Sequence, residues 1–241
     1  MRKAAKHTIV ILLLLTLSVT TAFLIYLHFF ASNDNDLSGE WTADLDMSKQ
    51  AAVTAFAWLQ DIEGVSISLE DIESYMQDVS VQMELNLEQT ARNNGNFSSN
   101  VLPESYEDCR QAAYEAFAMV FRAALSERLR MAGYAEGTDE EDIEALVTET
   151  FGMSTVSYLL TYGPALLPSF EELQEQYEGS GTYEVLEGIL IRQFNDGQFT
   201  EAKEEWYIRK DSCLILAGEN NFGMETSFSD LYPIIYTLKQ S

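Results

Sequence analysis

The stretch that decides the fold is "VSVQMELNLEQ", residues 79–89, in which apolar and polar side chains alternate without a break. A period of two turns one set of side chains toward a core and the other toward water, as in an antiparallel sheet. The pair Asn94-Gly95 follows, and Asn-Gly favours the positive φ angles of a tight turn. The stretch therefore predicts the first half of a hairpin, with residues 97–102 as its partner.

Four other segments alternate in the same way. They are "GEWTADLD" at 39–46, "GTYEVLEGILIRQF" at 181–194 around a turn at Glu187-Gly188, "EEWYIRKDSCLILAG" at 204–218 with a turn at Lys210-Asp211, and "LYPIIYTLKQ" at 231–240. Another turn is expected at 195–197, and Pro233 is restricted to the start or edge of the last strand. Seven or eight sequential strands favour a meander that closes into a small antiparallel β-barrel.

Helical periodicity interrupts the strands twice. Residues 48–64 predict a helix that Ser48 caps and Gly64 ends, and residues around 69–76 predict a short second helix. Residues 105–178 predict a helical insertion of four helices. Their end signals are the capping boxes Thr138–Glu141 and Ser169–Glu172, the cap Ser154, and Gly152 and Gly163 as stops. No βαβ alternation occurs, so the fold class is α+β without a parallel sheet.

The first 30 residues differ from the rest. Residues 8–30 contain no Asp, Glu, Lys or Arg, and as a helix they would span about 34 Å, enough for a bilayer core of about 30 Å. Phe29 stands where a cleavable signal peptide needs a small residue, so an uncleaved transmembrane signal anchor is favoured over a cleaved one. Basic residues precede the span, which predicts a cytoplasmic N-terminus. The chain then divides into residues 1–30, a spacer at 31–36, and an extracytoplasmic domain at 37–241.

That domain is strongly acidic. Beyond residue 30 the chain holds 39 acidic and 11 basic residues, a net charge of −28. Nucleic-acid binding depends on neutralising phosphates with Lys and Arg, so no nucleic acid is expected as a partner. An anionic bilayer surface is disfavoured as well. Contact with the lipid bilayer is therefore expected through residues 8–30 rather than through the domain.

Catalytic and metal-binding motifs are missing from the domain sequence. Both histidines, His7 and His28, lie in or before the predicted span, so no Ser-His-Asp, Cys-His or imidazole metal site can be built. The pair Gly179-x-Gly181 lacks the rest of a phosphate loop. Asp34 opens a stretch like a calcium loop, but its twelfth position is Leu45, which cannot ligate calcium. The expectation is a protein that is no enzyme and has no cofactor or metal.

Several of these segments resemble one family in order and in motif. "SGEWTADLDMS", "VSVQMELNLEQ" with "NNGNF", "GSGTYEVLEGILI" and "SCLILAG" with "LYPIIYTLK" are similar to lipocalin-like, membrane-anchored or secreted proteins of Gram-positive gut bacteria. That family pairs a Gly-x-Trp first strand with a later Gly-x-Tyr strand, here Gly39/Trp41 and Gly181/Tyr183. The resemblance implies a lipocalin-like barrel outside the cytoplasm and carries no established activity.

The candidate site residues are aromatic. Trp41, Trp58, Tyr183 and Trp206 are expected either to fill the barrel core or to line a cavity for an apolar or glycan ligand. Cys109 and Cys213 could form a disulfide in an oxidising compartment. The alternative is a pair of reduced, buried thiols.

Three functions fit these features. The first is a non-enzymatic module that binds a small molecule, a peptide or an envelope component. The second is a structural or interaction protein whose helical insertion docks another envelope protein, which requires an exposed apolar patch within 105–178. The third, and weakest, is a carboxylate-based hydrolase.

Overall fold

The computed structural model describes Thr21 and residues 36–62, 67–134, 136, 138–195, 202–218 and 233–239. Apart from Thr21, the predicted span at 8–30 lies outside these residues, as do Gly64 and most of the turn at 195–197. Among the helices in the described part, none combines the length and the apolarity needed to cross a bilayer.

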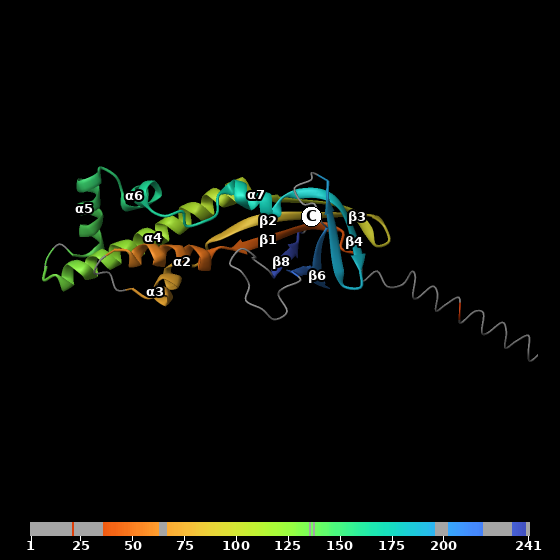
Figure 1. The fold of residues 1–241 in the computed structure, drawn as a ribbon, viewed down its shortest axis with the longest axis horizontal. Coiled ribbons are helices and arrows are strands. Elements are labelled where there is room, and N and C mark those ends of the chain that lie inside the picture. The colour runs from red at the N-terminus through yellow and green to blue at the C-terminus, as the bar shows by residue number, and fades with distance from the viewer. Residues whose placement is uncertain are drawn as a thin grey trace, which may run out of the picture.

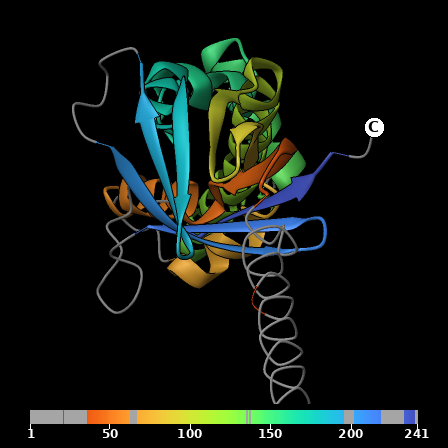
Figure 2. The ribbon, with the colours of Figure 1, turned by 90° about the vertical axis from the view of Figure 1, so that its right-hand side faces the viewer.

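Eight antiparallel strands close into a barrel in chain order, as the alternation predicts. They are β1 (Gly39–Asp46), β2 (Ser80–Ala91), β3 (Asn94–Val101), β4 (Gly179–Leu186), β5 (Ile189–Phe194), β6 (Lys203–Lys210), β7 (Cys213–Gly218) and β8 (Ile234–Leu238). Closure comes from β1 against β8, where Trp41 faces Leu238 and Thr42 faces Thr237. Figure 2 looks at the barrel end of the molecule, with β6 and β7 as its lower, blue wall.

Within the described residues, six helices lie between the strands. They are α2 (Ser48–Gln60) and α3 (Leu69–Tyr75) before β2, and α4 (Pro103–Met131), α5 (Glu140–Phe151), α6 (Thr155–Tyr162) and α7 (Phe170–Tyr177) between β3 and β4. The insertion of four helices is therefore confirmed. The long helix α4 runs from the barrel to the far end of the molecule, where α5 and α6 lie beside it (Figure 1). One continuous hydrophobic core joins the barrel interior to this helical layer.

Two predicted helix caps are wrong by one residue. Met47 occupies the N-cap of α2 without a side-chain hydrogen bond, and the Ser48 backbone donates instead to the Asp46 carboxylate. Asp139, rather than Thr138, caps α5 by accepting from the Asp142 backbone at 2.9 Å. In both places a carboxylate within two residues of the expected hydroxyl accepts a backbone hydrogen bond of the first helical turn. The caps of α6 and α7 are as predicted.

The turn of the first hairpin lies two residues earlier in the chain than the predicted Asn94-Gly95 turn. It consists of Arg92 and Asn93, and Gly95 lies inside β3, directly opposite Tyr183 of β4. A Cβ atom at Gly95 would lie 2.0 Å from the Glu88 carbonyl oxygen and 2.7 Å from the Tyr183 ring. Glycine is needed there because the chain segments approach closely. The hairpin at Glu187-Gly188, in contrast, turns at the predicted residues, which have positive φ angles of 48° and 89°.

Candidate functional site

The predicted aromatic residues separate into three places. Trp41 is fully buried in the barrel, and its indole N–H donates to the Leu37 carbonyl at 2.9 Å. Tyr183 is buried against Gly95, and burial raises the pKa of its hydroxyl. Trp58 lies outside the barrel on α2, where its ring packs between Phe117 and Phe121 of α4 at 5.6 and 5.9 Å. These residues do not form one cluster.

Trp206 is neither a core nor a cavity residue, contrary to the prediction. It lies on the outer face of β6 and is 44% exposed. The neighbouring residue, Glu205, points inward and is buried. Because side chains alternate along a strand, placing Glu205 inside puts Trp206 outside.

Glu205 forms an ion pair with Arg192 inside the barrel. The guanidinium Nε and Nη2 atoms donate to the two carboxylate oxygens, each at 2.7 Å. The guanidinium also lies over the rings of Phe97 and Phe194, 5.4 and 5.7 Å from their centroids. Near this pair, Tyr236 donates to the Met83 sulfur, and its burial raises the pKa of the phenol. The mostly apolar interior of the barrel thus contains one buried ion pair with aromatic rings beside it.

The two cysteines are free thiols, so the disulfide alternative is not formed. Cys109 is buried on α4, where burial raises the pKa of its thiol to about 12. Cys213 is partly exposed on β7, on the side opposite the inward Leu214. The reduced alternative therefore describes both residues, although only Cys109 is fully buried.

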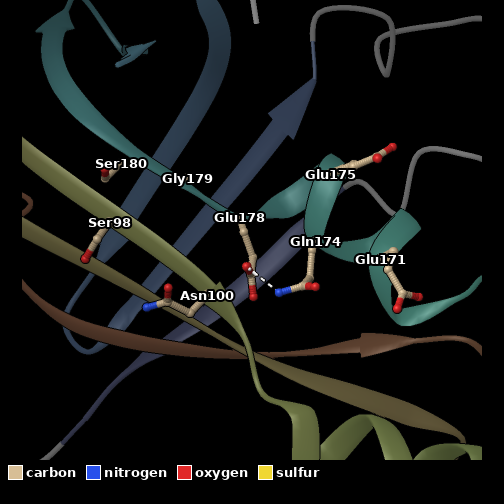
Figure 3. Close-up of a pocket in the computed structure, with 8 residues that line it drawn as sticks. All are labelled: Ser98, Asn100, Glu171, Gln174, Glu175, Glu178, Gly179 and Ser180. Atoms are coloured by element: carbon tan, nitrogen blue, oxygen red, sulfur yellow. Dashed lines mark hydrogen bonds between the residues drawn. The ribbon is translucent and has the colours of Figure 1, made fainter. Parts of the chain in front are cut away.

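A polar groove lies where α7 meets the outer side of β3 and β4 (Figure 3). Its volume is about 480 Å³. Its lining consists of Glu171, Gln174, Glu175 and Glu178 on the helix side, and of Ser98, Asn100, Gly179 and Ser180 on the strand side. None of these eight residues is basic, so the groove presents carboxylate, amide and hydroxyl groups to whatever enters it.

The position of α7 is fixed by its buried side chains and by hydrogen bonds to β3. Leu173 and Tyr177 are buried in the core. The Ser99 hydroxyl of β3 donates to the Tyr177 carbonyl at 2.7 Å. The Val101 backbone donates to one oxygen of Glu178 at 3.0 Å, and the Gln174 amide donates to the other at 2.8 Å. These bonds hold the groove wall in place without a ligand, so the groove is preformed.

Comparison with known proteins gave no match. Neither the protein-family models, the curated proteins nor the solved structures contain one for this chain. The resemblance to lipocalin-like envelope proteins therefore stays a prediction about family, while the closed antiparallel barrel is observed directly.

The far end of the helical insertion carries a second surface. Leu146, Phe151 and Tyr162 are 50%, 47% and 61% exposed on α5 and α6. Tyr158 lies between two of them, with its ring centroid 4.5 Å from that of Phe151 and 5.3 Å from that of Tyr162. We call the cluster of Phe151, Tyr158 and Tyr162 the aromatic end of the insertion.

Proposed function

We propose that this chain is a non-enzymatic binding module held on the outer face of a cell membrane by residues 8–30. In this proposal it binds a cationic ligand in the groove beside α7. The observation that carries the proposal is the composition of that groove: three glutamates and only uncharged partners around them. The membrane location rests on the sequence of residues 8–30.

The spacing of the acidic residues supports one extended ligand. Glu171 and Glu175, with the amide Gln174 between them, lie on one face of α7, and Glu178 follows as the C-cap residue beside that face. Their oxygens can accept hydrogen bonds from ammonium or guanidinium groups placed along that face. A polyamine or a peptide rich in Lys and Arg has such groups at regular intervals.

An organic cation fits better than a single metal ion. In the described part of the chain, no three acidic, His or Cys side chains come close enough to hold a metal ion. A groove of about 480 Å³ is also larger than one ion requires, since pockets for small organic ligands measure about 300–1,000 Å³. The charge of the domain, −28, would raise the local concentration of such a cation.

Calorimetry with spermine and with a Lys-rich peptide tests this function. We expect the full chain in detergent micelles to bind, and Glu171→Gln combined with Glu175→Gln to weaken binding at least tenfold. Glu140→Gln combined with Glu141→Gln on α5 is the control, because it removes the same charge far from the groove. Equal weakening by both double variants would reduce the effect to general electrostatics and would overturn the proposed site.

Membrane attachment is tested separately. In intact cells, an added protease should digest residues beyond about 36 and leave the N-terminal segment with the membrane pellet. The mass of that segment would distinguish an uncleaved anchor from a cleaved signal peptide. A domain that stays protected until cells are broken would contradict the proposed outward orientation.

A second candidate function is docking of another envelope protein through the aromatic end of the insertion. Exposed aromatic side chains are enriched at protein interfaces and are unusual on a self-repelling acidic surface. A photo-crosslinking residue at Tyr162 should give one discrete adduct in cells, whereas the same residue at Asn96 on β3 should give none. Adducts at both positions, or at neither, would count against docking at this end.

A further inference from the structure

The outer surface of the barrel has two unlike halves. On β1 and β2 the outward side chains include Glu40, Asp44, Asp46, Glu84 and Glu88. At the end of β4 and along β5 to β8 most outward positions are apolar, with Leu186, Trp206, Ile208 and Ile235 exposed by 52, 44, 64 and 57%. Although the domain has a net charge of −28, this side of the barrel surface carries few charged side chains.

Strand register gathers these residues into two rows. Leu186 is paired with Ile189, Ile189 with Trp206, and Trp206 with Ala217, which makes the first row. Ile208 is paired with Ile215 and Ile215 with Ile235, which makes the second row. Directly paired side chains touch across strands. We call the two rows together the apolar wall; Figure 2 shows β6 and β7, at its centre, along the lower side.

The central strand of this wall is complementary to itself. Along the outer face of β6 the order is Glu204, Trp206, Ile208 and Lys210, so opposite charges stand at the two ends of an apolar pair. If two copies meet face to face, a two-fold axis across β6 brings Glu204 of each copy to Lys210 of the other. The same axis brings Trp206 against Ile208. Neither Glu204 nor Lys210 belongs to the ion pairs found within the described residues.

We propose that the apolar wall is the interface of a two-fold symmetric dimer of this chain. A closed dimer needs such a self-complementary patch, in which residue i meets residue j and residue j meets residue i. The wall is also where two strongly acidic copies approach with little repulsion. A lipid surface is the weaker occupant, because an anionic bilayer would repel the acidic faces beside the wall.

The size of the wall sets the strength expected of the dimer. Strand spacings of about 4.8 Å over five strands, and two rows about 7 Å apart, give an apolar area of roughly 20 by 14 Å. A stable interface covers about 800 Å² on each partner, so polar residues at the rim must contribute most of the contact. We therefore expect a dissociation constant on the order of micromolar. Confinement in a membrane would raise the effective concentration.

A charge exchange tests the dimer without altering the core. The mass of the full chain in detergent micelles should rise from one to two copies as protein concentration increases through the micromolar range. Lys210→Glu places Glu204 opposite a like charge and should weaken association about tenfold or more. Glu204→Lys should do the same, and the variant with both changes should restore association. Lys49→Glu on α2 is the control for Lys210→Glu and should leave the mass curve unchanged.

Each other outcome would overturn the proposal. A single copy at every concentration, or a dimer that Lys210→Glu does not weaken, would exclude this interface. Failure of the double exchange to restore association would exclude the Glu204–Lys210 contact that defines it. If the chain is a single copy and brominated lipids quench the fluorescence of wild type more than that of Trp206→Phe, the wall belongs to the bilayer. The groove variants Glu171→Gln and Glu175→Gln should leave association unchanged, so the two proposals fail independently.

Discussion

Arg192 of β5 and Glu205 of β6 hold each other by two hydrogen bonds in the barrel interior, with side chains exposed by only 4% and 0%. Breaking such a pair leaves one charge buried without its partner, which costs about 3–5 kcal/mol. Replacing both members with apolar residues removes both charges together and is often close to neutral.

We predict that Arg192→Met and Glu205→Leu each lower the free energy of unfolding by about 3–5 kcal/mol. The double variant should recover most of that loss. Urea denaturation followed by circular dichroism measures all three. Glu107→Gln, which breaks an exposed pair with Arg110, is the control and should cost under about 1 kcal/mol. A double variant as unstable as the sum of the singles would show that the pair is not the dominant interaction.

We predict that Gly95→Ala destabilises the barrel by about 3 kcal/mol, the upper end for an overpacked site. The new methyl group would meet the Glu88 carbonyl oxygen at 2.0 Å, and backbone cannot move aside as a flexible side chain can. Asn96→Ala, outward and exposed on the same strand, should change stability by under about 0.5 kcal/mol. Similar unfolding midpoints for the two variants would mean that β3 and β2 are not packed this closely.

Glu144 gives the stability of the helical insertion a defined pH dependence. Its carboxylate accepts from Arg122 of α4 at 3.0 Å and from the Thr155 backbone of α6 at 3.1 Å. Burial alone would raise the pKa of Glu144, but the bond from Thr155 and the charge of Arg122 outweigh it and lower that pKa below 4.5. A lowered pKa stabilises the fold above 4.5, and the stabilisation is lost as pH falls through the folded value.

Accordingly, Glu144→Gln should be less stable than the wild type at pH 7, and the difference should shrink steadily below the ordinary value of 4.5. Unfolding curves measured at several pH values check this. Glu149→Gln, exposed on the same helix, should show no such convergence. A Glu144→Gln difference that stays constant down to about pH 3 would contradict the mechanism.

The two cysteines should differ sharply in reactivity. Only the thiolate attacks a maleimide or disulfide reagent, and a pKa of about 12 leaves Cys109 almost wholly protonated at pH 8. In the Cys213→Ser variant, we predict no labelling of the folded protein and complete labelling in urea. The Cys109→Ser variant should label while folded, through Cys213. Rapid native labelling of Cys213→Ser would mean that α4 opens readily.

The sequence predicts those elements of the fold whose pattern is contained in a few consecutive residues. In β2 the alternation places Val81, Met83, Leu85 and Leu87 inside, and all four are buried. In β6 the alternation is ambiguous, because the set with Glu204 and Trp206 and the set with Glu205 and Tyr207 each mix charged and apolar residues. What decides between them is the pairing of β6 with β5, which places Glu205 opposite Leu190 and diagonal to Arg192, within reach of the ion pair. That contact joins separate strands, so no single-strand pattern contains it.

The groove was missed for a similar reason. The periodic glutamates of α7 are visible in the sequence, but they read there as an ordinary solvated helix face. They line one side of a groove only because hydrogen bonds from Ser99 and Val101 of β3 hold the C-terminal end of the helix against the barrel. Gly95 is a second example of an interaction that the sequence does not contain. Glycine occurs both in turns and where two chain segments approach closely, and the sequence alone favours a turn at Gly95.

Because β1 and β8 lie at opposite ends of the domain sequence, the barrel cannot close until β8 has been synthesised. The hydrogen bond from the Thr42 hydroxyl to the Thr237 carbonyl joins residues 195 positions apart. At synthesis rates of about 5–20 residues per second, about 10–40 s would pass between the appearance of these two strands. Until then one edge of β1 has no strand to pair with, which makes the nascent chain vulnerable to aggregation. The dense negative charge, which keeps chains apart, therefore protects the protein before it is folded as well as afterwards.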